Sequence, residues 1–258
     1  MEKSTVIGML AGAISVFVGM VIKGAPITVL ANPAAILIIL GGTFSCLMTA
    51  YKMPQMKNFP NLIKKAFHAQ DLQGKVELVR LFIELSQIAR REGILALEGK
   101  VQELNDPFFK TGLSMVIDGM DPEFVSDVMD AELQVMQERH AEGRSMFVQA
   151  MTYAPTLGVL GAVVGLIAAL GNLKDIDALG HAISGAFAAT IYGIYTGYVL
   201  WGPFANKLKI MSEEEVAIKR MIVEGVLSLQ AGDSPTAIEA KLMVFIPQSE
   251  RAAFKKEE

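Results

Sequence analysis

The sequence feature that most constrains this fold is a long uncharged stretch past the middle of the chain. From Ser145 to Leu173, between Arg144 and Lys174, no acidic or basic side chain occurs. A helix of about 20 apolar residues crosses the hydrocarbon core of a bilayer, so this segment is long enough to span it. Within the segment, Pro155 removes a backbone donor and is expected to bend the helix or to begin its membrane part.

Three further uncharged segments also have the length of membrane spans. The whole chain is 19% charged, below the roughly 25% of soluble domains, and its charges are concentrated between these segments. The first apolar run is too long for a cleaved signal peptide and is interpreted as a retained helix. We therefore predict an all-α membrane protein with transmembrane helices at about 4–22, 34–51, 150–173 and 180–203.

The spans and the charged segments predict four parts. In order they are a transmembrane hairpin, a cytoplasmic helical domain, a second transmembrane pair and a cytoplasmic helical tail, at residues 1–51, 52–144, 145–206 and 207–258. Lysine and arginine gather beside the ends that face the large domain and the tail, so the positive-inside rule places both termini in the cytoplasm. Pro203 is expected to stop or kink the fourth helix near its exit from the membrane.

Both spans of the second pair carry small residues at helical spacing. The third span has Gly158, Gly161, Ala162 and Gly165, and the fourth has Gly185, Ala189, Gly193 and Gly197. Small residues let helix backbones approach closely in lipid. Two interpretations follow: these faces receive a helix of another chain, or they pack this chain's own helices. The hydroxyls of Thr156 and Thr190 either line such a contact or bond their own backbone. Tyr198 and Trp201, near the end of the fourth span, are expected to anchor it at the membrane interface.

The spans contain no Asp, Glu, Lys or Arg. Proteins that move ions place an ionisable group in the span that carries the ion, so a carboxylate for ion transport would have to come from another chain. The three histidines lie on different segments, and phosphate-binding and nucleophile motifs are missing, so neither an enzyme nor a metal or other cofactor is expected. A net charge of −4 argues against a nucleic-acid partner.

Several motifs, taken in chain order, resemble one family. They are Arg90-Arg91-Glu92-Gly93 with Leu95-Ala96-Leu97-Glu98, then Tyr153-Ala154-Pro155-Thr156-Leu157-Gly158, Gly180-His181-Ala182-Ile183 and Pro203-Phe204-Ala205-Asn206-Lys207. Together they resemble the MotA family, the larger subunit of the flagellar motor stator, over nearly the whole chain. The resemblance implies a ring of five copies around two MotB-type single-span subunits in the bacterial cytoplasmic membrane, in contact with lipid. The MotB-type aspartate would supply the missing carboxylate, and ion flow would drive torque on the rotor protein FliG.

The resemblance also implies roles for particular residues. Rotor contact is expected at Arg90 and Glu98, with Arg91 and Glu92 beside them, and conformational coupling is expected at Pro155 and Pro203. Thr190 and Ala162 match positions that face the partner's aspartate. The remaining residues expected on the ion pathway or partner-helix face are Thr156, Gly158, Gly161, Gly165 and Tyr198. Sodium-driven relatives tend to have threonine at the position of Ala162, so the interpretation favours protons, with sodium as the alternative.

Three other functions remain as alternatives. An ExbB- or TolQ-like proton-channel subunit shares the small-residue spans but has three spans rather than four. A transporter that works alone should show polar sites within the membrane or inverted repeats, and the sequence shows neither. A membrane scaffold without ion flux would use the large cytoplasmic domain for docking.

Overall fold

The computed structural model describes residues 3–68, 70, 72–171 and 173–254, and every regular element among them is a helix. Four helical stretches are long and apolar enough to cross a membrane, which confirms the predicted all-α membrane fold. They are Lys3–Ile22, Pro33–Ala50, Pro122–Leu170 and Ile176–Gln230. The chain forms two compact units, and each is described here by itself.

The first unit comprises Met1–Ala69 and His140–Ile210. Its N-terminal elements are α1 (Lys3–Ile22), η1 (Ile27–Leu30), α2 (Pro33–Ile36), the π-helical η2 (Leu37–Gly41), α3 (Gly42–Ala50) and α4 (Met53–Phe67). Asn32 caps α2 by accepting a hydrogen bond from the Ala35 amide at 3.1 Å, with Pro33 at the first helical position.

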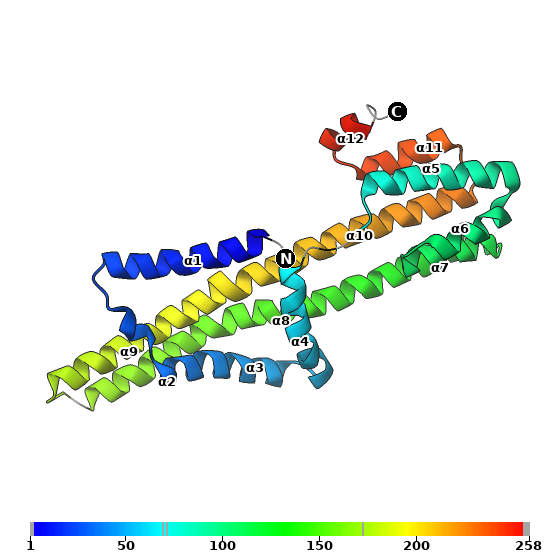
Figure 1. Cartoon of the computed structure of the whole chain (residues 1–258). Coiled ribbons are helices and arrows are strands. Elements are labelled where there is room, and N and C mark those ends of the chain that lie inside the picture. The colour runs from blue at the N-terminus through cyan, green and yellow to red at the C-terminus, as the bar shows by residue number, and fades with distance from the viewer. Residues whose placement is uncertain (1–2, 69, 71, 172, 255–258) are drawn as a thin grey trace. The chain divides into compact units, whose positions relative to one another are not determined.

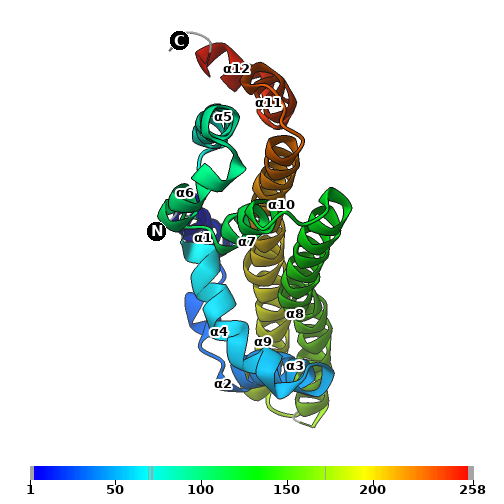
Figure 2. The same ribbon diagram turned by 90° about the vertical axis from the view of Figure 1, so that its right-hand side faces the viewer.

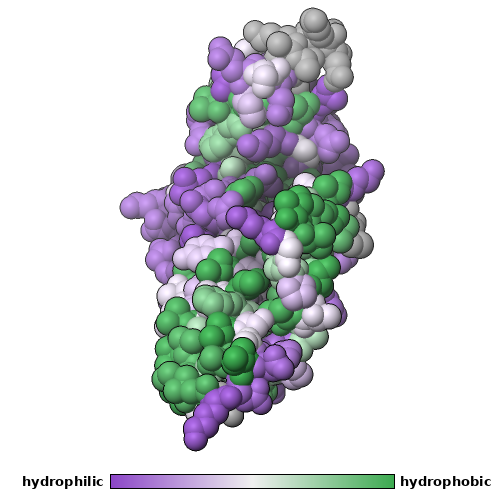
Figure 3. Space-filling view, turned by 90° about the vertical axis from the view of Figure 1, so that its left-hand side faces the viewer, coloured by the Kyte–Doolittle hydropathy of each residue, from purple (hydrophilic) through white to green (hydrophobic). Residues whose placement is uncertain are grey.

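The remaining elements of this unit come from three helical segments in the second half of the chain. They are the C-terminal part of α8 (Pro122–Leu170), then α9 (Ile176–Ile194) and the π-helical η4 (Tyr195–Trp201), and the start of α10 (Gly202–Gln230). The C-terminal part of α8 and α9 lie side by side (Figures 1 and 2). Figure 3 shows apolar residues gathered on the outer surface, as expected where lipid or another membrane helix replaces water.

Pro203 does not end the fourth helix. Helical backbone continues through it to Gln230, so the expectation that Pro203 stops the helix is wrong. The physical reason lies in η4: the Gly202 amide bonds the Gly197 carbonyl, five residues back, so the helix is locally widened just before the proline. A widened turn accommodates a proline ring that would clash in a regular α-helix.

The second unit comprises Gln70–Arg139 and Met211–Glu258. Besides parts of α8 and α10 it contains α5 (Lys75–Glu92), η3 (Ile94–Leu97), α6 (Glu98–Glu103), α7 (Pro107–Ile117), α11 (Pro235–Leu242), η5 (Met243–Phe245) and α12 (Gln248–Phe254). Its apolar core includes fully buried Phe82, Phe109 and Met221, and the Phe82 and Phe109 rings stack with centroids 4.8 Å apart. The helix α5 follows the apolar spacing that the sequence predicts.

The helix α4 packs within the first unit, although the sequence predicts a cytoplasmic domain that begins at residue 52. Its apolar face buries Met56, Phe59 and Ala66 against residues of α3, α8 and α10. The rings of Phe59 and Phe147 stack with centroids 4.7 Å apart. A break in charge therefore locates the end of a span but does not reveal which core the next helix joins.

Candidate functional site

The small residues of α8 and α9 form the tightest helix contact of the first unit. A β-carbon on Gly158 would lie 3.1 Å from the Ala189 carbonyl oxygen, and one on Gly165 would lie 2.8 Å from the Ala186 β-carbon. From the other side, a β-carbon on Gly193 would lie 2.7 Å from the Ala154 carbonyl oxygen. The two small-residue faces that the sequence shows therefore meet each other, and the backbones approach to contact distance.

This contact bears on the two interpretations of the small-residue face of α8, which could receive a partner's helix or pack against this chain's own helix. Gly158 and Gly161 are buried, and Gly165 is half-buried, all against this chain's own α9. The expectation that these three glycines form the face for a partner's helix does not agree with their place in the structure. The reason is that α9 presents an equally small face, so the hairpin fills its own groove.

The other residues expected on the ion pathway lie beside this contact or outside it. Ala162 and Thr190 are half-buried, and Thr190 is next to Gly158, whose added β-carbon would lie 3.5 Å from the Thr190 α-carbon. Thr156 is exposed on α8, and Tyr198 is 61% exposed on η4. The structure thus offers an outer surface that contains hydroxyl groups but no charge.

The hydroxyls of both threonines bond their own helix. Thr156 Oγ1 donates to the Thr152 carbonyl at 3.1 Å, and Thr190 Oγ1 donates to the Ala186 carbonyl at 3.4 Å. Such bonds to the carbonyl four residues back are common for threonine in membrane helices. Each hydroxyl oxygen keeps a lone pair, so it can still accept a hydrogen bond from a protonated group.

The prolines expected to couple conformations lie in different surroundings. Pro155 is inside α8, where it leaves the Met151 carbonyl without its usual backbone donor. A β-carbon on Gly197 would lie 2.8 Å from Pro155 Cγ and 2.9 Å from the Met151 oxygen. Gly197 thus lies directly against the irregular turn of α8, while Pro203 is exposed at the start of α10.

An aromatic cluster next to Pro203 was not predicted from the sequence. Trp201 lies 5.9 Å from Phe59 and 6.5 Å from Phe204, measured between ring centroids, and Phe147 completes the group. Trp201 is therefore half-buried and packs against the aromatic rings of α4, α8 and α10. It does not serve as a free anchor at the membrane interface. Phe59 and Phe147 are too distant in sequence from Trp201 and Phe204 for spacing to reveal the cluster.

The charged residues expected at the rotor contact lie together at the end of α5 and the start of α6. Arg90, Arg91 and Glu92 form the last turn of α5 and are exposed, and exposed Glu98 begins α6. Between them Gly93 has a φ of 88°, a backbone conformation that glycine adopts without strain. The glycine turns the chain sharply, so both groups of charges are presented at one corner of the second unit.

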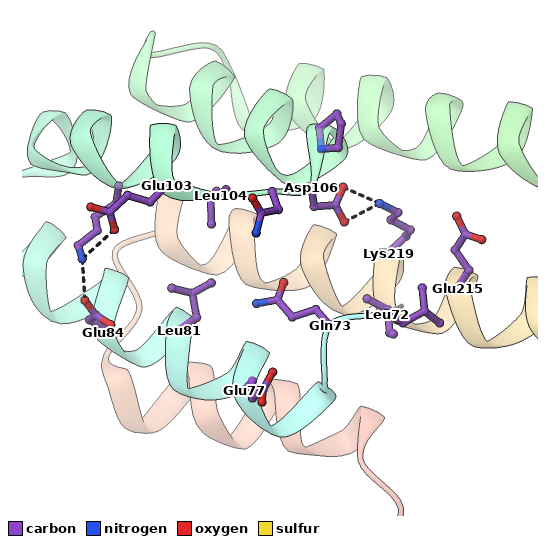
Figure 4. Close-up of a pocket in the computed structure, with 14 residues that line it drawn as sticks. Leu72, Gln73, Glu77, Leu81, Glu84, Glu103, Leu104, Asp106, Glu215 and Lys219 are labelled. Carbon is purple, nitrogen blue, oxygen red and sulfur yellow. Dashed lines mark hydrogen bonds and ion pairs between the residues drawn. The ribbon is translucent and has the colours of Figure 1, made fainter. Parts of the chain in front are cut away.

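A cavity of about 750 Å³ opens between α5, α6 and α10 in the same unit (Figure 4). At one end Lys100 bridges Glu84 and Glu103 at 3.2 and 3.3 Å, and hydrogen bonds to these carboxylates, Glu84 first, raise the pKa of Lys100. At the other end Lys219 Nζ lies 2.6 Å from the Asp106 carboxylate, which also caps α7. The first group of charges joins α6 to α5, and the second joins the start of α7 to α10.

Comparison with known proteins gives the family. The profile of the MotA/TolQ/ExbB proton channel family matches residues 100–221, and that of the motility protein A N-terminal region matches residues 6–93. The chain is 49% identical to motility protein A of Bacillus subtilis over 254 residues, which cover 98% of this chain and 94% of that protein. The chain belongs to the MotA family.

Solved structures agree with this assignment. The chain of this MotA family member superposes on the flagellar MotAB stator complex from Bacillus subtilis with a TM-score of 0.92 at 49% identity, covering 98% of this chain and 99% of that chain. For C. jejuni MotAB the TM-score is 0.91 at 31% identity, with 96% and 97% covered. The chemotaxis protein PomA of Vibrio alginolyticus is 30% identical over 252 residues, which cover 98% of both chains.

Membership of the MotA family settles the broad function. The chain is a stator subunit of the flagellar motor and a non-enzymatic channel component of the bacterial membrane. The N-terminal profile covers the first hairpin. This hairpin gives the chain four spans, whereas ExbB- or TolQ-like subunits have three, so it argues against that alternative. Comparison does not assign individual residues, so their roles are proposed below.

Proposed function

We propose that this MotA family chain provides an uncharged surface on which a single-span MotB-type subunit places its ion-carrying aspartate. The observation that carries this proposal is the complete lack of Asp, Glu, Lys and Arg in residues 145–173 and 182–206, which include the packed parts of α8 and α9. A channel helix needs an ionisable group to hold a proton or cation away from water. That group must therefore belong to the partner.

The partner's helix lies on the outer surface beside the α8–α9 contact. Since Gly158, Gly161 and Gly165 are covered by α9, the residues left for the aspartate are Thr190, Ala162, Thr156 and Tyr198. A threonine hydroxyl stabilises either form of the aspartate, because it donates to a carboxylate and accepts from a carboxylic acid. Ala162 provides no oxygen for a partly dehydrated sodium ion, and this supports proton coupling.

Changes of charge at the aspartate alter how the partner's helix packs. Burying an ionised carboxylate in an apolar contact costs much more free energy than burying a protonated one. Protonation of the aspartate therefore favours closer packing of the partner's helix against this chain. The region of Pro155, the Met151 carbonyl and Gly197 is the irregular part of the α8–α9 pair that can respond. Pro203, two residues after the end of the widened η4, extends this irregular region into the start of α10.

Torque is delivered through the second unit, where Arg90, Arg91, Glu92 and Glu98 form the contact for the rotor protein FliG. The support is their shared exposed corner around Gly93. Charges of both signs fix the register of a contact and raise its association rate more than they raise affinity. Such a contact suits a stator that must engage and release repeatedly. The ring holds five copies, with both termini of each chain in the cytoplasm.

The test is a flux measurement on reconstituted vesicles. Vesicles contain this chain alone, this chain with its MotB-type partner, or this chain with a partner whose aspartate is replaced by asparagine. Proton flux, followed with a pH-sensitive dye, is expected only with the acid-bearing partner. Flux through this chain alone, or through the asparagine complex at the same rate, would contradict the proposal.

A further inference from the structure

Three helix ends meet at a cavity beside Arg90 that has no role in the function proposed above. The cavity has a volume of about 320 Å³ and is lined by residues at the ends of α5, α7 and α10. Two of these helices are followed by glycines with left-handed backbone, Gly119 at φ 74° and Gly232 at φ 72°. Such glycine caps let the chain leave each helix sharply, and a hollow remains between the ends.

The wall of this cavity is mainly apolar. Side chains of Ile94, Val116, Met120 and Leu229 line it, and Ala89 contributes only a methyl group. The polar and charged residues of the wall are Ser86, Arg90, Gln230 and Asp233. The volume lies within the range of about 300–1,000 Å³ in which small-molecule sites are found. An apolar hollow of this size, at an exposed corner proposed to contact a partner, is suited to one large side chain.

One polar atom in the wall has no partner. Gln230 Nε2 donates to the Met120 carbonyl at 2.6 Å, and this bond fixes the amide orientation because a carbonyl can only accept. Gln230 Oε1 therefore points elsewhere, and it is buried without a hydrogen bond among the described residues. A buried acceptor without a partner destabilises the fold, so a donor from outside would be favoured there.

We propose that this cavity binds an aromatic side chain with a neutral donor, a tyrosine or tryptophan, from the rotor protein. The apolar wall matches the ring, and Gln230 Oε1 accepts from the O–H or N–H. Arg90 and Asp233 are the charged residues of the wall. Asp233 is already paired with Lys241 at 2.9 Å, so the positive charge of Arg90 decides, and it disfavours a lysine or arginine. Tyrosine and tryptophan are the residues that most often anchor protein contacts in such pockets. The inference rests on the proposed function, in which Arg90 contacts the rotor.

The first experiment fills the cavity from α5. Ala89→Leu adds an aliphatic side chain to the wall at a helical position, and Ala131→Leu adds the same atoms at an exposed position of α8 outside this cavity. Both are made in the complete stator complex. Ala89→Leu should weaken binding of purified FliG about tenfold, which corresponds to about 1.4 kcal/mol, while leaving proton flux unchanged. The Ala131→Leu complex should match the wild type in both measurements.

The second experiment blocks the cavity after folding. Met120 is 39% exposed, and Cys46 is the single cysteine, so Met120→Cys in a Cys46→Ser background gives one labelling site. A bulky maleimide added to the assembled complex should abolish FliG binding, and the unlabelled complex should retain it. Normal binding by the labelled complex would overturn the inference. Loss of subunits from the stator complex on labelling would also overturn it, because the cavity would then lie between stator subunits.

A separate variant distinguishes failure of the inference from failure of the proposed function. Arg90→Glu should weaken FliG binding whether or not the cavity is used. If Arg90→Glu weakens binding but the blocked cavity does not, only the inference is wrong. If neither change alters binding, the proposed rotor contact is wrong as well.

Discussion

The α8–α9 contact depends on single glycines whose missing side chains set the distance between two backbones. At Gly193 a β-carbon would lie 2.7 Å from the Ala154 carbonyl oxygen and 2.8 Å from the Gly158 α-carbon. Both are backbone atoms, so no side-chain rotation can relieve the overlap. The helices would have to separate, and close packing is the main force between helices in lipid.

Gly193→Ala is therefore expected to destabilise the complex by at least the 1–3 kcal/mol that is typical of overpacking. Gly180→Ala on the same helix is the matched control, because a β-carbon there meets nothing within 4 Å. The control should be neutral or slightly stabilising, since alanine favours a helix by about 0.5–1 kcal/mol over glycine. Thermal unfolding of both purified complexes measures the difference. Equal melting temperatures would show that the two helices are not held at backbone contact.

Pro155 is a second residue on which the α8–α9 contact depends. Pro155→Ala restores an amide that can bond the Met151 carbonyl, and alanine in a helix is favoured over proline by about 3 kcal/mol. The variant should assemble at wild-type level but generate no torque, because regular hydrogen bonding stiffens the turn that lies against Gly197. Bead-tethered motors measure torque, and size-exclusion chromatography measures assembly. Normal rotation of the variant motor would rule out a coupling role for this proline.

At the scale of elements, the turn between α10 and α11 is held by charge. Lys241 Nζ lies 2.9 Å from the Asp233 carboxylate and 3.3 Å from that of Glu224. The hydrogen bond from Lys241 is the main cause that lowers the pKa of Asp233, and the bond to Asp233 is the main cause that raises the pKa of Lys241. Both groups are thus fully charged at neutral pH.

The stability from Asp233 should be lost in acid only. Its folded pKa lies below the ordinary value of 3.8, so its contribution is complete above that value and disappears as the pH falls through the folded pKa. Asp233→Asn should lower the melting temperature by the same amount at pH 6 and pH 8, and the difference should shrink below about pH 4. Melting curves of both proteins across this range provide the measurement. A difference that peaks near neutral pH would assign the effect to another group.

Elements were predictable from the sequence where local rules decide them. The four spans follow from apolar length. The caps at Asn32 and Asp121 follow from side chains that bond the first helical amides. Passage of the helix through Pro203 was not predictable, because it depends on a bond from Gly202 to Gly197 five residues back.

The candidate site was predictable only in part, because composition does not identify contact partners. Sequence spacing shows small faces around Gly161 and Ala189, but it cannot say that these faces meet within one chain. Likewise, a glycine after charged residues indicates the exposed corner at Arg90. The cavity at Gln230 requires three helix ends that are distant in sequence. What remains unpredictable from one sequence is therefore tertiary contact.

At the scale of the whole molecule, α1 stands out because none of its residues is buried in the single chain. Small residues at steps of three and four, Gly8, Gly12, Ser15 and Gly19, form a seam along α1. A β-carbon on Gly12 would lie 2.8 Å from Val199 Cγ1, but β-carbons on Gly8 and Gly19 would meet nothing within 4 Å. A small-residue seam left open in lipid is suited to close contact with another helix. We expect this contact to form with a neighbouring copy in the ring.

Gly8→Leu should therefore reduce the fraction of complete complexes severalfold, since the added side chain holds the neighbouring backbone away from the seam. Leu10→Trp is the control, because Leu10 is 58% exposed and lies on the opposite side of α1 by helical spacing, where added bulk meets lipid. Native mass spectrometry of the detergent-extracted complex counts the copies in each variant. Because each single chain has room for a β-carbon at Gly8, a loss of assembly without loss of the folded chain would assign the seam to contact between copies. If Gly8→Leu assembled as well as Leu10→Trp, the outer face of α1 would be lipid-facing, and another surface would have to hold the ring together.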